Sequence, residues 1–411
     1  VWRRGSLPSD ATPPPAINET NLPLALPDGF KISIFARDLP EARVMRFDRF
    51  GNLWVSRTKE GAVTLLEITD GRVVSQDDIF TGLKNPHGLA FDPGEGLQLY
   101  IAEEHRLWRV TTYSDDPGED LLTFPVGGHF TRTIGFGPDG RLSISVGSSC
   151  NVCRERDERR AAILSYDIAS GKTELFARGL RNAVFFTWDA FGRMWATEMG
   201  RDELGDDLPP DEINIIEAGG PSAPLGTNDY GWPICYGKNV HDNDFDPVPS
   251  PQAGSYGAGK NVYVRDPCAD KEPSAIDIPA HSAPLGLAFI PLNSTWPEEY
   301  WYDLLVAYHG SWNRSQPTGY KVVRHKFDAA GNYEGVEDFI TGWLAPSGVE
   351  GLTPSGDVLE LGRAPAALGR SDAGLALGRP VDIIVLSDGT AYISDDKAGV
   401  IYRVSVITPP R

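Results

Sequence analysis

Short apolar segments alternate with glycine-containing turns along most of the chain. In six places an apolar strand leads into a turn, usually rich in Asp and Gly, and a second apolar strand follows. The six units begin at Ala42, His87, Thr131, Arg181, Ser282 and Arg379. Several units continue into a third strand, as in HRLWRV, AAILSYDI, DEINIIEA, GYKVVRHKF and GVIYRVSV. The pattern predicts antiparallel hairpins of one recurring type.

Hairpins that recur every ~40–50 residues are typical of a β-propeller. A β-sandwich is the alternative, but its strands would not repeat the same turn signature. We therefore predict an all-β fold, a single six-bladed β-propeller over residues 23–411, preceded by a flexible, proline-rich segment at residues 1–22. Long inserted loops near residues 201–280 and 341–378 interrupt the repeat, and loops of such length are usually functional or interaction surfaces.

The charge balance narrows the classes of partner. The chain has 57 acidic and 38 basic residues, and its formal net charge is -19. Such a charge argues against nucleic acid and against anionic membrane surfaces as partners. No apolar stretch approaches the ~20 residues of a membrane helix, so we expect no membrane span. Neutral or cationic ligands and bound calcium are compatible with the composition.

The four cysteines are Cys150, Cys153, Cys235 and Cys268. Cys150 and Cys153 could form a redox pair, half of a zinc site or a local disulfide. The disulfide is favoured because there is no second CxxC motif and no helix pattern that would lower a thiol pKa. Cys235 and Cys268 flank a long loop and are expected to close it, although three connectivities remain open. Two disulfides favour a secreted or periplasmic protein.

Polar residues recur where the repeat predicts one mouth of the channel. The first strand of each blade lines the channel and the second runs back antiparallel to it. The starts of the first strands and the ends of the second strands therefore lie at the same mouth of the channel. The starts carry Arg43, His87, His129, Arg132, Arg181, Asn182, His281 and Arg379. The ends carry Arg57, Glu104, His105, Ser148, Glu198, Gly200, His309, Asp395 and Lys397. A cationic cluster in an acidic protein predicts a site for an anionic ligand rather than a merely solvated rim.

Motifs around this mouth resemble one known family. LRNAVFFTWDAFGRMWATEMG is followed by PPDEINII and YGWP, and GSSCNVC, RDELGDDLPPDEIN, AYHGSWNR and PTGYKVVR accompany them. The chain resembles the soluble glucose dehydrogenases and sorbosone dehydrogenases that depend on pyrroloquinoline quinone (PQQ), especially the sorbosone-dehydrogenase-like branch. The resemblance covers about residues 28–406. It implies a six-bladed propeller with PQQ, a tricarboxylate, at the channel mouth.

The resemblance implies a role for each residue at the mouth. His129 matches the general base that takes a proton from the sugar's anomeric hydroxyl while hydride passes to the quinone. Arg181 and Asn182 match residues that contact the quinone oxygens and complete the catalytic set. The other residues expected to bind the cofactor are Arg379, which matches a ligand of a PQQ carboxylate, and His87, Arg132, His309 and Trp312.

The resemblance also implies calcium. The backbone carbonyls of Gly200 and Arg201 match ligands of the calcium that bridges the protein and PQQ. Asp211, Glu212 and Tyr230 fall near a second, structural calcium site, where hard oxygen ligands are expected.

Two positions depart from the family pattern. The glucose dehydrogenases have an Asp that orients the base, whereas this chain has Ser148 within Gly147-Ser148-Ser149. A Lys that contacts PQQ falls in AYHGSW, where His309 or Trp312 would take its place.

The sequence therefore predicts a PQQ- and calcium-dependent oxidoreductase that oxidises an aldose or sugar aldehyde of the pyranose or sorbosone type. Electrons would pass to an external acceptor such as a cytochrome, a quinone or a dye. A calcium-dependent lactonase or esterase is one alternative, but its channel metal would be held by Asn, Asp and Glu side chains. A propeller that binds ligands without catalysis is the other, because fold alone does not establish function.

Overall fold

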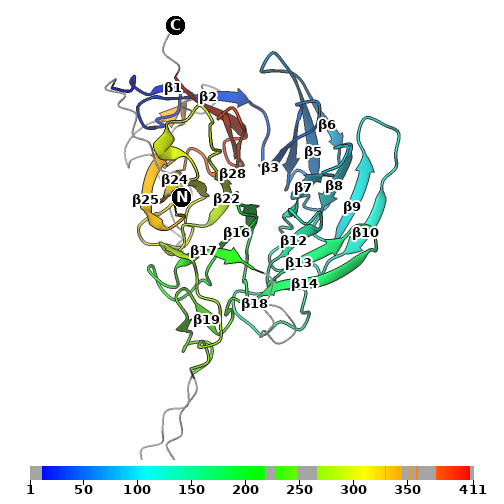
Figure 1. The fold of residues 1–411 in the computed structure, drawn as a ribbon, viewed down its shortest axis with the longest axis vertical. Helices are drawn as coiled ribbons and strands as arrows, with labels where there is room; N and C mark the ends of the chain where they lie inside the picture. The colour runs from blue at the N-terminus through cyan, green and yellow to red at the C-terminus, as the bar shows by residue number, and fades with distance from the viewer. Residues whose placement is uncertain are drawn as a thin grey trace, which may run out of the picture.

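The computed structural model describes residues 12–217, 228–247, 266–328, 330–344, 351–352, 358–359 and 376–407. Within these ranges six of the sheets are blades of four antiparallel strands around a common centre, and two of the blades carry a fifth, parallel strand (Figure 1). The predicted six-bladed β-propeller is thus confirmed. In Figure 1 the first strands β3, β7, β22 and β28 lie toward the centre, whereas β6, β10 and β25 lie at the periphery.

The first three blades are built from consecutive strands. From the centre outward, the first blade has β3 (Ala42–Phe47), β4 (Leu53–Arg57), β5 (Ala62–Thr69) and β6 (Arg72–Phe80). The second has β7 (Gly88–Phe91), β8 (Gln98–Ala102), β9 (Arg106–Thr111) and β10 (Glu119–Thr123). The third has β11 (Ile134–Phe136), β12 (Leu142–Val146), β13 (Ala162–Asp167) and β14 (Lys172–Arg178). A short strand, β18 (Asn228–Asp229), extends the third blade and is parallel to β14.

The next two blades carry most of the insertions. Their strands are β15 (Phe185–Trp188), β16 (Met194–Glu198), β17 (Asp211–Ile216) and β21 (Ile276–Ile278), then β22 (Pro284–Phe289), β23 (Leu304–Tyr308), β24 (Lys321–Phe327) and β25 (Tyr333–Ile340). A short 3₁₀ turn, η2 (Glu298–Tyr300), precedes β23. The predicted long loops contain two small hairpins, β19 (Cys235–Tyr236) with β20 (Val240–His241) and β26 (Gly351–Leu352) with β27 (Val358–Leu359).

The sixth blade joins the two ends of the chain. Its strands are β28 (Pro380–Val385), β29 (Ala391–Asp395), β30 (Val400–Val406) and β2 (Phe30–Ala36), and β1 (Ile17–Glu19) pairs in parallel with β2. The described part of the segment that was predicted to be flexible, residues 12–22, contacts this blade through β1 and Leu22. Leu22 is only 3% exposed, because burying apolar side chains against the closing blade outweighs the freedom of a loose end.

The recurring turns have a shared physical cause. In DRFGNLW the Asp48 carboxylate accepts two backbone N–H groups of its turn and the indole Nε1–H of Trp54 at 3.0 Å. Asp189 makes the same three bonds in DAFGRMW, including one of 3.0 Å from Trp195. Gly51 has a φ of 83°, which favours glycine at that position. Each turn thus ties a hairpin to a buried indole.

Apolar side chains of neighbouring blades pack together between the sheets and form the core. Of the residues that the structure describes, none belongs to a helix long and apolar enough to cross a bilayer.

Candidate active site at the channel mouth

Strand register brings the predicted site residues to one end of the channel. First residues of inner strands pair with last residues of second strands, as in Gly88 with Ala102 and Pro380 with Asp395. The predicted polar residues lie at these strand ends or within a few residues of them. We call this end the polar mouth; it comprises the strand starts and strand ends named in the sequence analysis.

His129 is held by Ser148 through both backbone and side chain. The His129 backbone N–H donates to the Ser148 carbonyl at 2.9 Å, and Nδ1 lies 3.1 Å from that oxygen and 3.0 Å from Oγ. The Ser148 hydroxyl donates its own proton to the Cys150 carbonyl at 2.6 Å. Nδ1 must therefore carry a proton and donate it, which leaves a lone pair on Nε2.

Nε2 of His129 is available for chemistry. It makes no hydrogen bond within the described part of the chain, and the His129 residue is only partly buried. Burial, followed by the positive charge of Arg181, lowers the pKa of His129 to about 3, although its hydrogen bond to Ser148 opposes the shift. The imidazole is consequently neutral near pH 7 and can accept a proton.

Arg181 organises the loop that follows the fourth blade's second strand. Its Nε donates to the Asn151 carbonyl at 2.8 Å, and Nη1 donates to the Gly200 carbonyl at 2.8 Å. Nη2 pairs with Asp202 at 3.2 Å. Next to it, the Asn182 backbone N–H donates to Glu198 Oε1 at 2.9 Å.

Three buried carboxylates lie beside these residues. Both oxygens of Asp211 accept backbone N–H groups, from Gly200 and Ala283, at 2.9 Å each. Both oxygens of Glu212 also accept hydrogen bonds. Glu198, which stands opposite Glu212 in the β16–β17 register, has a buried Oε2 with no partner.

The negative charges of these three carboxylates are poorly compensated by their surroundings. Burial raises the pKa of Asp211 and of Glu212 to about 7 each. Burial and the charge of Glu212 raise the pKa of Glu198 well above its ordinary value. A small cavity is lined by Glu198, Glu212, Gly200, Arg201, Tyr230, Tyr236 and Asp242, among others. An unpartnered carboxylate oxygen at such a cavity has the chemistry of a ligand for a hard cation.

The other residues predicted at the metal site have protein partners. The Arg201 guanidinium pairs with Asp242 at 2.9 Å and Asp244 at 3.1 Å. The Tyr230 hydroxyl donates to the Ile215 carbonyl at 2.7 Å. These contacts order the walls of the cavity.

A second cluster at the mouth joins blades five, six and one. His309 Nε2 lies 2.9 and 3.1 Å from the two oxygens of Asp396, which also pairs with Arg43 at 2.7 Å. Arg379 donates from Nε to the His309 carbonyl at 3.0 Å and from Nη2 to the Gly310 carbonyl. Trp312, in the same loop, is 53% exposed.

The two halves of the mouth are connected through Asp202. Its Oδ2 contacts Arg181, and its Oδ1 accepts the side-chain N–H of Asn313 at 2.7 Å. The loop that carries His309 and Trp312 is thereby tied to the Arg181 side of the site.

His87 and Arg132 lie deeper than the sequence suggested. His87 is fully buried with no partner for Nε2, and burial, followed by the charge of Arg43, lowers its pKa well below the ordinary value. Arg132 donates to the carbonyls of His129, Thr131 and Pro125, each at 2.8 Å. Its guanidinium thus supports the loop that carries His129.

Sequence reasoning missed several contributors. Asp202, Asp396 and Arg160 received no role, and Glu198 was only one of the strand ends. Arg160 donates to the carbonyls of Gly127 at 2.7 Å and Val126 at 2.6 Å, just before His129. Glu198 could have been found, because a carboxylate in an otherwise apolar strand directly opposite another one is rarely buried without a purpose.

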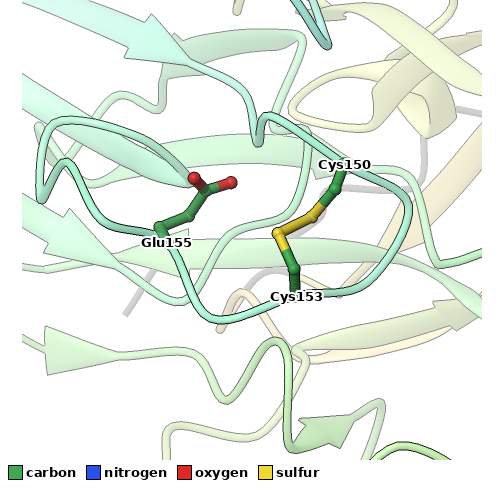
Figure 2. A group of neighbouring side chains, drawn as sticks. All are labelled: Cys150, Cys153 and Glu155. Atoms are coloured by element: carbon green, nitrogen blue, oxygen red, sulfur yellow. A yellow bond between two sulfur atoms is a disulfide. The ribbon is translucent and has the colours of Figure 1, made fainter.

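Both predicted disulfides are confirmed, Cys150–Cys153 and Cys235–Cys268. Figure 2 shows the first beside Glu155. These three residues are the one group of three or more His, Cys, Asp or Glu side chains that lies close enough to hold a metal within the described ranges. The two sulfurs are bonded to each other, so they offer no thiolates, and Glu155 instead accepts hydrogen bonds from Ser149 at 2.6 and 2.9 Å.

A cavity of about 470 Å³ lies away from the polar mouth. Its walls come from the later residues of the inner strands, including Phe91, Phe136, Trp188 and the ion-paired Arg46 and Asp382. The candidate site is therefore marked by its buried charges and free ring nitrogens rather than by the volume of this hollow.

Comparison with known proteins gives a consistent family. A family model described as TrAA12-like matches residues 24–406. A protein of uncharacterised function from Borreliella burgdorferi is 28% identical over 413 residues, with 95% of this chain and 92% of that protein covered. A PQQ-dependent pyranose dehydrogenase from Coprinopsis cinerea is 26% identical over 424 residues. That match covers 93% of this chain but 54% of the relative, so the chain spans about half of its length.

Solved structures share the fold. The holo form of the pyranose dehydrogenase PQQ domain from Coprinopsis cinerea superposes with a TM-score of 0.69 at 22% identity, covering 95% of this chain and 99% of that one. A calcium structure of a Trichoderma reesei family AA12 enzyme gives 0.71 at 20% identity, covering 95% and 98%. The names of these relatives agree with the resemblance at the level of PQQ-dependent sugar dehydrogenases and do not single out the sorbosone-dehydrogenase branch. Because the family model covers nearly the whole chain, the protein belongs to the TrAA12-like family.

Proposed function

We propose that the protein is a PQQ- and calcium-dependent dehydrogenase that oxidises an aldose or sugar aldehyde and passes the electrons to an external acceptor. The observation that carries the proposal is His129, a neutral imidazole whose Nδ1 is anchored on Ser148 while Nε2 stays free at the polar mouth. The names of the relatives, pyranose dehydrogenase among them, support the same chemistry.

The polar mouth fits an anionic cofactor. Burial lowers the pKa of Arg379, and burial together with the charge of Arg379 lowers the pKa of Lys397. Burial thus outweighs the negative charge that Asp395 and Asp396 bring to these two cations, and further negative charge nearby would stabilise them. A tricarboxylate such as PQQ would supply it, with Arg379 and Arg181 as the residues that would hold the cofactor.

The neighbouring cavity fits calcium. Glu198 Oε2 has no partner, Glu212 stands opposite it, and Gly200 lines the same cavity. Carboxylate and carbonyl oxygens are the ligands that calcium prefers. Glu198, Glu212 and Gly200 would therefore hold the ion, and its charge would compensate the buried carboxylates.

The residues at the polar mouth would have separate roles in the reaction. When bound, PQQ would supply a quinone that accepts hydride from the sugar carbon. His129 Nε2 would take the hydroxyl proton, and Ser148 keeps the imidazole in the required tautomer. Arg181 and Asn182 would stabilise negative charge that develops next to them. Arg132 and Arg160 keep the His129 loop in place through their bonds to its carbonyls.

The test begins with purified protein treated with a chelator. PQQ and calcium are added, binding is followed by absorbance, and dye reduction is measured with a panel of aldoses and sugar aldehydes. Saturable, sugar-dependent reduction that requires both additions supports the proposal. Hydrolysis of lactones with calcium alone would favour the lactonase alternative, and PQQ binding without turnover of any sugar would favour a binding propeller.

The disulfides support a place in an oxidising compartment, and we propose a secreted or periplasmic location. The same panel of sugars would show whether the substrate is of the pyranose or the sorbosone type.

A further inference from the structure

Asp396 connects three blades at the polar mouth. It follows β29 and reaches both His309, which follows β23, and Arg43 in β3. Asp396 and His309 are nearly buried, with side chains 10% and 13% exposed. This Asp–His pair lies apart from His129, whose own imidazole has no carboxylate partner among its hydrogen bonds.

The pair determines where the proton of His309 resides. Burial acts to raise the pKa of Asp396, but His309 and Arg43 together hold it well below the ordinary value. Burial lowers the pKa of His309 to about 4 even though Asp396 opposes the shift. Near pH 7 an ionised carboxylate therefore faces a neutral imidazole, and Nε2 must carry the proton that Asp396 accepts.

The opposite ring nitrogen is then an acceptor. His309 Nδ1 makes no hydrogen bond within the described part of the chain, and the side chain is 13% exposed. The backbone is held on both sides, since the His309 N–H donates to the Ala283 carbonyl at 3.0 Å and Arg379 binds the His309 carbonyl. The ring is thus fixed in position as well as in tautomer.

Other charged groups around the ring do not compete for Nδ1. Arg43 is engaged by Asp396, and Arg379 donates to the carbonyls of His309 and Gly310. Asp395 accepts the backbone N–H groups of Arg379, Lys397 and Ala398 and the hydroxyl of Tyr402. The Lys397 ammonium group can only donate hydrogen bonds, so it could not alter the tautomer that Asp396 fixes.

We propose that Asp396 is a positioning residue that fixes His309 in the Nε2–H tautomer, so that Nδ1 accepts a hydrogen bond from a hydroxyl group of the sugar bound at the polar mouth. The hydroxyl concerned is one that does not react, because proton abstraction is assigned to His129. The inference rests on the proposed function. It adds His309 as a residue that favours sugars with a hydroxyl group placed to donate a hydrogen bond to Nδ1. A deoxy sugar that lacks this group would leave Nδ1 unpaired.

The tautomer can be tested without cofactor or substrate. In protein labelled with ¹⁵N-histidine, His309 is assigned from the spectrum of His309→Leu. We expect its Nε2 to be protonated and its Nδ1 unprotonated from pH 6 to 8, and we expect Asp396→Asn to shift this equilibrium. Asp246→Asn is the matched control, because Asp246 pairs with another histidine, His241, at 3.2 Å. A protonated Nδ1 in the unmutated protein would overturn the proposal.

The hydroxyl contact is tested on the loaded enzyme. At saturating PQQ, His309→Leu should raise KM for the preferred sugar about two- to tenfold, the usual worth of one hydrogen bond, while kcat stays within a factor of two. In the His309→Leu background Asp396→Asn should have little further effect on KM, because it acts through the ring. Additive effects, or an unchanged KM in His309→Leu, would contradict the assignment.

The two proposals fail in different ways. If the unmutated protein turns over no sugar, the proposed function and the sugar contact both fall, whereas the NMR result still decides the role of Asp396. If sugars are oxidised but the loss of each hydroxyl in turn affects His309→Leu and the unmutated enzyme equally, only the further inference is overturned.

Discussion

Nδ1 of His129 lies 3.0 Å from the hydroxyl oxygen of Ser148, whose own proton is donated to the Cys150 carbonyl. The imidazole is therefore oriented by a neutral acceptor. A carboxylate at this position would raise the pKa of the histidine, whereas a serine adds no charge. The consequence is a base that stays neutral over the whole ordinary pH range and takes up a proton weakly in the free protein.

His129→Gln should leave PQQ bound but reduce sugar-dependent turnover by about 10²–10⁴-fold, the usual contribution of positioned proton transfer. Cofactor titration by absorbance and steady-state dye reduction measure the two effects separately. His105→Gln is the control for loss of a polar-mouth histidine that has no assigned role, since that ring is 39% exposed. Full activity in His129→Gln would rule out this residue as the base.

The pH profile follows from the depressed pKa of His129. The imidazole accepts a proton only while neutral, that is, above a pKa of about 3, so its titration should produce no loss of kcat/KM near pH 6.5. A fall with a midpoint near 6.5 in the unmutated enzyme, absent in a His129 variant with residual activity, would show that the ring titrates normally.

Arg379→Ala should weaken PQQ binding by about 10- to 150-fold, because losing a charge-assisted hydrogen bond costs ~1.5–3 kcal/mol. Turnover at saturating cofactor should change little. Since Arg379 also binds the carbonyls of His309 and Gly310, Arg379→Lys serves as the comparison that keeps the charge. Normal PQQ affinity combined with lost turnover would be the opposite of what we expect.

Calcium should stabilise the protein more at pH 8 than at pH 5. Burial raises the pKa of Asp211 and Glu212 to about 7, so the folded state retains protons that the unfolded state releases. Without metal, stability is therefore lost as the pH rises from about 4 through about 7. Calcium compensates the ionised forms, and occupancy at 100 times Kd adds ~2.7 kcal/mol.

Thermal unfolding with and without calcium at the two pH values measures this effect. Glu198→Gln should remove most of the calcium-induced shift in Tm, whereas Glu174→Gln, at an exposed position, should keep it. An equal shift in Glu198→Gln would show that the ion binds elsewhere.

Replacing both Cys235 and Cys268 by Ser should lower the free energy of unfolding by about 3–4 kcal/mol, the chain-entropy value for the roughly 33-residue loop that this disulfide closes. The Cys150–Cys153 bridge has a sequence separation of only 3, so its removal should cost less. Denaturant unfolding of the two double variants gives the comparison. A larger loss for the Cys150–Cys153 pair would mean that this bridge supports structure beyond its own loop.

The propeller could be predicted because its signal is local. Each hairpin carries its own turn, and Asp48 and Asp189 both bind the turn backbone and a tryptophan a few residues later. The disulfides could be predicted for a similar reason, since four cysteines leave few pairings. The joining of the chain ends was not predicted, because β2 pairs with β30 across nearly the whole length of the sequence.

The sequence by itself determined which end of each hairpin carries polar groups, since antiparallel pairing brings strand starts and strand ends together. Only the tertiary structure decided what those groups do. It turned Arg132 inward to hold a loop, left Glu198 without a partner, and placed Asp396 between His309 and Arg43. Proton location and charge compensation depend on distances of a few ångströms between separate blades, and no spacing along one strand encodes such distances.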